Sequence, residues 1–409
     1  MSSTSPNAPM AQRTPGLPTA GSFRHLERMT DDTGLLEHSL GWVPRRNEGY
    51  TTDDNARALW ACVEWLELVS GDPERQTLLE RLADRYLAFL LWARKDGGTF
   101  HNNFTYSRLP EEEEPSDDCH GRVLWALAVA LGRWPNDRRG LAAAALLAEA
   151  LPVAESLRYP RGQAYALMAC CRLLEMLEPH HRTERQTELS GAASRLLPPA
   201  AQLEQWARQL ETRLTEAYRR QADDRWRWIE PVMTYGNGII PAGLLAAHLR
   251  FGRRETGIIA RDMLDFLIEK MTVPEGWIRP IGNQGWCTRE QCSQWDQQPL
   301  ETMKLALACL FAHRAFGASE YAAVVRKCRD WFHGRNDAGV PLADEEGGCC
   351  DGLTADGPNF NRGAESTLSY LLTEAMALRL ERETGDFPIA AGEADIGDAG
   401  TARPVGSRA

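Results

Sequence analysis

The 409-residue sequence has no run of about 18 consecutive apolar residues, the length that a membrane-spanning helix requires. It also has no excess of basic residues. The formal net charge of -11 argues against nucleic-acid or anionic-membrane partners, because both bind clustered Lys and Arg. We find no GxxxxGK[ST], HExxH or GxSxG motif and no convincing dinucleotide GxGxxG. These absences exclude the common nucleotide, zinc-protease and serine-hydrolase templates.

The ten cysteines do not follow the pattern of a disulfide framework. Five of them lie in apolar helical stretches, where free Cys acts as a small hydrophobe: Cys62, Cys170, Cys171, Cys309 and Cys328. The pairs Cys287/Cys292 and Cys349/Cys350 lack the spacing of a tetrahedral zinc site. We therefore expect neither a metal nor another cofactor.

The two ends of the sequence differ in composition from its middle. Residues 1–21 lack the apolar core of a signal peptide, and we expect a disordered leader there. Residues 386–409 are rich in Gly, Ala and Asp, and we expect a disordered tail. Residues 22–385 predict one domain, and a cytoplasmic location is the default for such a chain.

A phrase recurs along this domain, in which a polar, aromatic and Gly-rich loop runs into an apolar helix. It begins at six positions: Thr51, Ser116, Arg158, Thr234, Gln294 and Asn359. Between these helices lie others with apolar residues at i, i+3, i+4 and i+7, beginning near Arg75, Gly140, Gln202, Thr256 and Ser319. Alternating buried and amphipathic helices predict two concentric rings. An open solenoid is the competing arrangement, although its repeats are usually shorter and more uniform.

The chain resembles a bacterial six-hairpin, glycosidase-like family, whose members occur alone or attached to glycosyltransferases. The resemblance is carried by MTDDTGLLEHS, GYTTDDNARALW, SDDCHGRVLWALA, WIEPVMTYGNGIIPAGLL, PIGNQGW, WDQQPLET and EGGCCDGLTADGPNFNRGAESTLSYLL. It covers all but the two tails and implies an all-α (α/α)6 barrel with long loops over one face. Because such toroids host hydrolases, lyases, epimerases and inactive domains, the fold does not settle the function.

Carboxylates at the helix starts are the candidates for acid/base chemistry. Glycoside cleavage needs a proton donor and a second carboxylate that activates water or attacks carbon. Glu230 and Asp296 lie beside aromatic residues, and an apolar environment raises the pKa of a carboxyl group. We therefore expect one of these two residues to be the proton donor. Asp54 and Asp118 are expected to be the ionised partners, since helix N-termini stabilise negative charge. Each Asp pair could equally serve as a helix cap.

The same loops predict the groups that would bind a sugar. Amides supply both donors and acceptors, and aromatic rings stack on pyranose faces. The candidates are Asp53, Asn55, Arg57, His120, Arg122, Trp228, Tyr235, Asn237, Asn283, Trp295, Gln297, Gln298, Asn361 and Glu365. Several have a structural alternative. The arginines could neutralise adjacent acids, Glu365 could belong to a capping box, and His120 could be a structural histidine.

The favoured hypothesis is a carbohydrate-active enzyme that cleaves or transfers a glycosidic bond in an oligosaccharide. One alternative is a non-catalytic glycan-binding module that works with a glycosyltransferase. Another is a sugar epimerase or isomerase, which would use two imidazoles on opposite faces of a ring-opened sugar. Of the three histidines near the motif segments, His120, His101 and His38, only His120 lies on one of the recurring helices, which counts against the epimerase.

Overall fold

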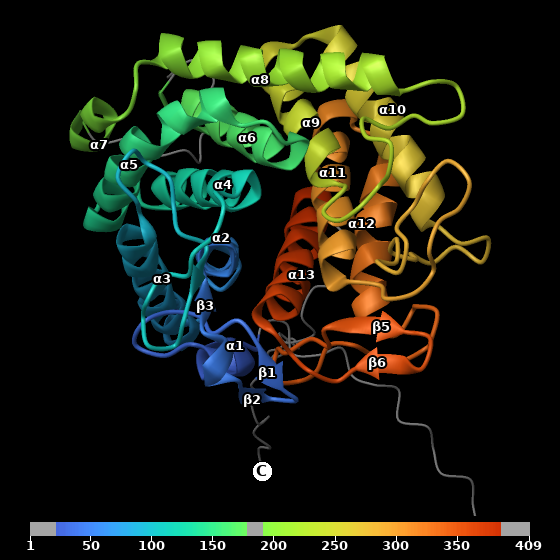
Figure 1. Ribbon diagram of the computed structural model, residues 1–409, viewed down its shortest axis with the longest axis horizontal. Coiled ribbons are helices and arrows are strands. Elements are labelled where there is room, and N and C mark those ends of the chain that lie inside the picture. Colours follow the sequence, from blue (N-terminus) through green and yellow to red (C-terminus); the bar gives the residue numbers. More distant parts are fainter. Residues whose placement is uncertain (1–21, 178–190, 386–409) are drawn as a thin grey trace, which may run out of the picture.

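The computed structural model describes residues 22–177 and 191–385. The expected leader, 1–21, and the expected tail, 386–409, lie outside these described residues. The described chain is mostly helical, with a few short strands (Figure 1).

Six helices form an inner ring, and they are the six that the repeated phrase predicts. They are α2 (Thr52–Leu68), α4 (Asp117–Arg133), α6 (Pro160–Leu177), α9 (Ile239–Phe251), α11 (Pro299–Phe316) and α13 (Ala364–Thr384). Each packs against the next, and α13 packs against α2, so the ring closes. The predicted all-α (α/α)6 barrel is confirmed, and the open solenoid is wrong. Most side chains of these helices are buried, because each helix has neighbours in the ring and an outer helix behind it.

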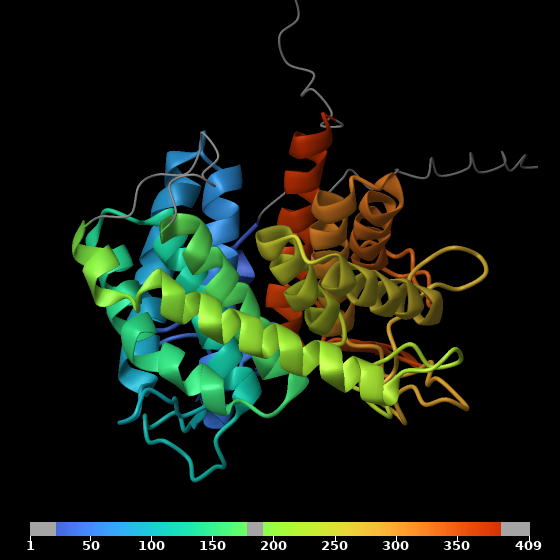
Figure 2. The same cartoon turned by 90° about the horizontal axis from the view of Figure 1, so that it is seen from above.

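The outer helices are α1 (Arg24–Met29), α3 (Pro73–Ala93), α5 (Arg138–Ala150), α8 (Ala200–Gln221), α10 (Arg254–Met271) and α12 (Ser319–Phe332). Apart from α1, each outer helix follows in the chain the inner helix against which it mainly packs. The short helix α7 (Gly191–Leu196) and the 3-10 turns η1 (Arg46–Glu48) and η2 (Leu151–Ser156) lie in connections. Figure 2 shows α8 on the outside of the toroid. The outer helices bury only one face, as their amphipathic spacing predicts.

The helix predicted from Gly140 onward is shorter than its apolar pattern. It ends at Ala150, and the chain continues as η2. Pro152 explains the change, because proline lacks the N–H that an α-helical bond needs and its ring crowds the preceding turn.

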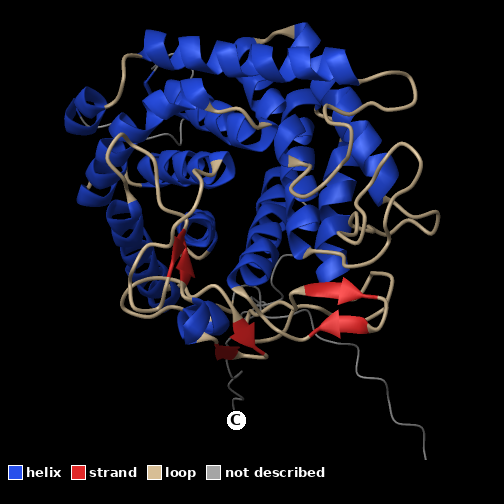
Figure 3. Ribbon diagram, in the orientation of Figure 1, coloured by secondary structure: helices blue, strands red, loops and turns tan. Residues whose placement is uncertain are grey.

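Three small antiparallel sheets gather on one side of the toroid (Figure 3). They pair β1 (Ser39–Leu40) with β2 (Val43–Pro44), β3 (Tyr50–Thr51) with β4 (Asn103–Phe104), and β5 (Gly352–Thr354) with β6 (Gly357–Asn359). Residues 273–286, which the sequence predicts as short strands and turns, form turns and a single bridge between Thr272 and Ile278.

Cysteine chemistry differs at one point from the sequence analysis. Cys287 and Cys292 form a disulfide within the Trp-rich loop, which their spacing did not predict. The other cysteines are buried thiols, as apolar surroundings favour. Among the described residues, no helix is both long and apolar enough to cross a membrane.

Candidate active site

A polar hollow lies where the inner helices begin. It consists of two adjoining parts with volumes of about 570 Å³ and about 380 Å³. Both parts are lined by Asp53, Asn102, Asn283, Gln298 and Glu365, so they form one continuous cavity. We call this cavity the mouth of the toroid. The ring thus brings first turns that are far apart in the sequence to one place.

Arg57 is the hub of the charged side chains in α2. Its guanidinium lies 2.6 Å from Asp54 Oδ1, 3.6 Å from Asp53 Oδ2 and 3.0 Å from Glu365 Oε2. The Arg57 side chain is only 1% exposed, whereas that of Glu365 is 38% exposed. Arg57 therefore lies beneath the mouth and holds three carboxylates that face it, and it neutralises acids rather than offering itself to a ligand.

The adjacent carboxyls of Asp53 and Asp54 differ in protonation. Burial, together with the negative charges of Asp53 and Glu365, raises the pKa of Asp54 to about 8 although Arg57 opposes this. Burial also acts to raise the pKa of Asp53, whose side chain is 17% exposed against 7% for Asp54, but Arg122 and Arg57 hold its pKa below the ordinary value. At neutral pH the mouth therefore carries one protonated and one ionised carboxyl side by side.

The protonated state of Asp54 differs from the sequence-based expectation. An Asp in the first turn of a helix is expected to be ionised, because the positive end of the dipole stabilises its charge. Here burial disfavours the charged form of Asp54 most, and the negative charges of Asp53 and Glu365 add to this effect.

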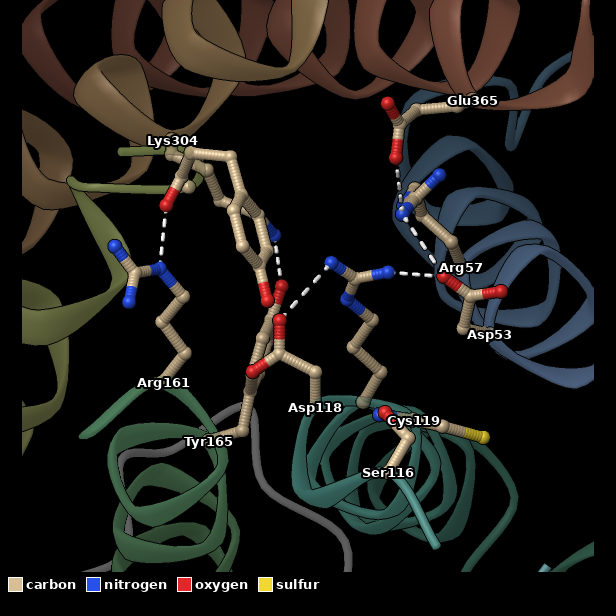
Figure 4. A network of polar contacts seen from close by, with 12 residues as sticks. Asp53, Arg57, Ser116, Asp118, Cys119, Arg161, Tyr165, Lys304 and Glu365 are labelled. Carbon is tan, nitrogen blue, oxygen red and sulfur yellow. Dashed lines mark hydrogen bonds and ion pairs between the residues drawn. The ribbon is translucent and has the colours of Figure 1, made fainter. Parts of the chain in front are cut away.

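Arg122 of α4 links the carboxylates of two helices. It donates to Asp53 Oδ2 and lies 3.4 Å from Asp118 Oδ2, and its side chain is 10% exposed. Burial and a hydrogen bond to Asp118 raise the pKa of Tyr235 to about 12, so this phenol stays protonated at the mouth. Figure 4 shows the side chains of α2, α4, α6, α11 and α13 converging in this network.

A buried lysine lies beside this charged network (Figure 4). Lys304 of α11 is 1% exposed, and its Nζ contacts the hydroxyl of Tyr165 on α6 (Figure 4). Burial, together with the positive charges of Arg122 and Arg57, places the pKa of Lys304 well below its ordinary value. The surroundings of this amine therefore disfavour its charged form.

A second polar cluster joins α6 to the loop that precedes α9. Arg161 donates to Glu230 Oε1 at 3.0 Å and to Thr234 Oγ1 at 2.8 Å. Its guanidinium also lies over the ring of Tyr235, 4.7 Å from the centroid. Glu230 is thus in an ion pair with Arg161 and is not part of the mouth lining.

The loop between Asn283 and Asp296 carries backbone strain beside the mouth. Trp286 and Asp296 have φ angles of 57° and 54°, in the left-handed region that non-glycine residues rarely adopt. Both line the mouth, and Asp296 Oδ2 accepts a hydrogen bond from Gln284 at 2.8 Å. Strained backbone held by surrounding structure is a common feature of functional sites.

The structure brings many of the predicted site residues together. Those that line the mouth are Asp53, Asp54, Asp118, Arg122, Tyr235, Asn283, Asp296, Gln297, Gln298 and Glu365. The side chain of Gln297 is already bonded to Asp337 and to Trp331. Those that do not line it are Asn55, Arg57, His120, Trp228, Glu230, Asn237, Trp295 and Asn361.

Residues outside the lining have structural partners. Asn55 bonds the backbone of Leu35, and Asn361 Oδ1 accepts from the backbone N–H of Gly41. His120 is buried with Nε2 3.1 Å from the carbonyl of Ala150, and burial lowers its pKa to about 4. These contacts give His120 the structural role that the sequence left open.

Asn237 and Trp228 are likewise internal. The Asn237 amide donates to Glu301 Oε2 at 2.8 Å, and burial raises the pKa of Glu301. Trp228 is fully buried, and the half-buried Trp295 packs against the core. For these two indoles, packing explains the position better than stacking on a sugar does.

The mouth also contains residues that the sequence analysis did not single out as candidates. They are Glu37, His38, Thr51, Asn102, Asn103, Ser116, Cys119, Trp286, Asp351, Thr354, Asn359 and Ser366, with a few backbone and apolar positions. Asp351 is the most notable, because burial raises its pKa while it accepts from the backbone N–H of Gly363 at 2.6 Å. Its position in the segment DGLTADG, close to one of the recurring motifs, could have identified Asp351 as a candidate from the sequence.

Within residues 22–177 and 191–385, no group of three or more His, Cys, Asp and Glu side chains is arranged to hold a metal ion. The carboxyls that line the mouth supply groups for acid/base chemistry.

The fold is shared with several solved structures of sugar-active proteins. A cellobiose 2-epimerase from Bacillus thermoamylovorans aligns with a TM-score of 0.64 at 11% identity, covering 88% of this chain and 95% of the other. A GH76 α-mannanase from Bacteroides thetaiotaomicron has a TM-score of 0.60 at 10% identity, covering 88% and 95%.

A third similar structure is an α-1,6-mannanase of Salegentibacter, described as an inactive variant with two consecutive aspartates changed to asparagine, in complex with α-1,6-mannotriose. Its TM-score is 0.56 at 12% identity, covering 88% of this chain and 97% of the other. No protein-family model matches the chain, and no curated protein matches it. At these identities the similarity shows the six-hairpin, glycosidase-like (α/α)6 fold.

Proposed function

We propose that this protein is a carbohydrate-active enzyme that cleaves or transfers a glycosidic bond in an oligosaccharide. One observation carries the proposal: Asp53 and Asp54 line one polar mouth while their pKa values are shifted in opposite directions. Neighbouring carboxyls with separated pKa values are the arrangement that lets one donate a proton while the other stays charged.

The two aspartates take distinct roles in this proposal. Asp54, protonated at neutral pH, donates its proton to the glycosidic oxygen as the bond to the anomeric carbon breaks. Asp53, held ionised by Arg122 and Arg57, activates the attacking water or stabilises the positive charge that develops on the sugar ring. Asn283 and Gln298 would bind hydroxyl groups at the same mouth.

The second Asp pair of the chain is less suited to chemistry. Asp117 accepts from the backbone N–H groups of Arg158 and Tyr159 at 2.6 Å and 2.8 Å, so it fastens the start of α6. The mannanase variant with two consecutive aspartates changed is described as inactive, which supports a role for such a pair. In this protein, Asp53–Asp54 is the pair whose members both line the mouth.

The alternatives have weaker support. An epimerase of the expected type needs two imidazoles at the sugar, but of the described histidines only His38 lines the mouth. A glycan-binding module would use the same amides without needing a protonated Asp54. A glycosyltransferase partner and a cytoplasmic location remain proposals that follow from the sequence.

The decisive experiment is a screen of oligosaccharides with product detection by mass spectrometry. We expect turnover by the wild type and its loss in Asp54→Asn and Asp53→Asn, because each removes one of the two carboxyl roles. Asp117→Asn is the matched control, since it makes the same change in the other pair and an amide oxygen can still accept the backbone bonds.

Binding without turnover would contradict the proposal and favour the glycan-binding module. Full activity in both Asp53→Asn and Asp54→Asn would overturn the assignment of roles even if sugars are cleaved. Circular dichroism of each variant separates loss of chemistry from loss of fold.

A further inference from the structure

An exposed hairpin stands at the edge of the mouth. Strands β1 and β2 are joined by the two-residue turn Gly41–Trp42, in which Gly41 has a φ of 59°. The turn is held against the loop before α13, because Asn361 Oδ1 accepts from the Gly41 N–H at 3.2 Å and Ser39 Oγ accepts from the Arg362 N–H at 2.8 Å. The position of Trp42 is thus fixed by contacts with a segment that is distant in the sequence.

The cavity lining continues directly into this hairpin and loop. Glu37 and His38, which immediately precede β1, line the mouth. So does Asn359, which ends β6 and immediately precedes Phe360. In Figure 1 the pairs β1–β2 and β5–β6 lie at the same end of the molecule. A chain molecule that leaves the mouth on this side would pass over residues 40–43 and 360.

The indole of Trp42 is held rigidly although it is exposed. Its Nε1 donates to Asp344 Oδ2 at 2.9 Å, and the Arg362 guanidinium lies over its ring, 4.8 Å from the centroid. Arg362 Nε donates to the same Asp344 oxygen at 2.6 Å, so the three side chains support one another. The residue is still 48% exposed, which leaves a preorganised ring surface open to solvent.

Further exposed apolar side chains lie on this hairpin and on the loop that holds it. Phe360 is 66% exposed, and Leu40 and Val43 are exposed to similar extents. Arg362 links the two aromatic positions, since it also donates to the carbonyl of Phe360 at 2.7 Å. Isolated exposed apolar residues are ordinary, but a cluster beside a polar cavity, with one ring fixed in place, indicates a binding surface. We call Leu40, Trp42, Val43 and Phe360 the rim patch.

We propose that the rim patch is a subsite for sugar units outside the mouth, and that the substrate is therefore an oligosaccharide rather than a free monosaccharide. The inference rests on the proposed function of the mouth. Trp42 and Phe360 would stack on the apolar faces of pyranose rings, and the polar groups of His38 and Asn359 would contact hydroxyls between the patch and the catalytic pair. A ring fixed before binding loses little conformational freedom on contact, which suits a weak stacking subsite.

The test measures how affinity depends on sugar length. Calorimetric titrations would use α-1,6-linked manno-oligosaccharides and β-1,4-linked gluco-oligosaccharides, from monosaccharide to hexasaccharide. Each protein would carry Asp54→Asn so that the ligand stays intact, and the rim variants would be Trp42→Ala and Phe360→Ala. Ile258→Ala, which removes an exposed apolar side chain from α10, is the matched control.

We expect Trp42→Ala to weaken binding of the longest sugars by about fivefold, the size of one lost aromatic contact, with the shortest sugars and the control unaffected. If sugars bind but both rim variants keep the full gain with length, the rim inference is overturned and the proposed function stands. Equal weakening for short and long sugars would overturn it too, because the effect would then lie inside the mouth. If no sugar binds the Asp54→Asn protein and the wild type turns over none, both proposals fail.

Discussion

The two ends of the inner ring are built from the same helices but differ in charge balance. At the mouth, the first turns supply more carboxylates than cations, and Asp54 retains a proton. At the opposite end, the last turns surround a cavity of about 190 Å³ with apolar walls. Several of the charged groups there form ion pairs, since Arg379 lies 2.9 Å from Glu64 and Arg172 lies 3.5 Å from Glu175.

The difference shows which end of the toroid holds groups that are suited to proton transfer. At the edge of the opposite cavity, the ion pair of Arg379 with Glu64 joins the neighbouring helices α13 and α2. Unmatched carboxylates, buried together, raise one another's pKa and produce a proton donor at neutral pH. The comparison predicts that changes at the mouth act on turnover and that changes at the opposite end act on stability.

The largest expected effect is on turnover. Asp54→Asn should lower kcat by about 100-fold or more, because an amide cannot donate the proton that a general acid supplies. Glu175→Gln at the opposite end should leave kcat unchanged. Steady-state rates on a sugar found by the screen would measure both, and equal losses in the two variants would break the comparison between the ends.

The next largest effect is expected on stability, at the buried Lys304. The lowered pKa of Lys304 means that the folded protein releases a proton that the unfolded chain keeps up to about pH 10. The unfolded state therefore binds more protons between these two pKa values, and wild-type stability rises with pH in that window. We expect Lys304→Met to be more stable than the wild type near neutral pH by about 1–3 kcal/mol, an advantage that shrinks toward pH 10.

Denaturant unfolding at several pH values would measure this difference. Lys327→Met, on the partly exposed face of α12, is the control and should show no comparable dependence on pH. A constant difference between wild type and Lys304→Met across the range would indicate that the buried amine does not change its protonation on folding.

A subtler change tests the carboxylate repulsion itself. With Asp54 as the acid, kcat/KM should fall as pH rises through about 8. Glu365→Gln removes one negative charge that raises this pKa and leaves Arg57 more available to Asp54, so the fall should move to lower pH. Glu64→Gln at the opposite end should not move it. A shift to higher pH in Glu365→Gln would contradict the electrostatic account.

The smallest expected effect is at the opposite end. Arg379→Met breaks ion pairs with Glu64 and Glu67, whose side chains are 13% and 52% exposed. We expect a loss of about 1–2 kcal/mol in the free energy of unfolding, between the values typical of surface and buried pairs. Turnover at saturating substrate should stay at the wild-type value. A loss of activity without a loss of stability would show that the two ends are coupled.

The sequence predicted the ring well and the site less completely. The six recurring phrases located the inner helices because burial on all sides imposes apolar residues throughout a helix. The same phrases predicted Asp53, Gln298 and Glu365, which line the mouth. They also predicted Asn55 and Asn237, whose amides are used inside the protein. An amide near a helix start gives the same sequence pattern whether its side chain faces the mouth or the protein interior, because the direction of the side chain depends on packing.

What the sequence determined by itself is the alternation of buried and amphipathic helices, and with it a closed toroid whose polar first turns meet. Only the tertiary structure decided which carboxyl holds a proton. Glu365 lies 308 residues from its partner Arg57, and Lys304 lies 139 residues from Tyr165. The pKa of a buried group depends on charges within a few ångströms in space, and the closure of the ring sets those distances.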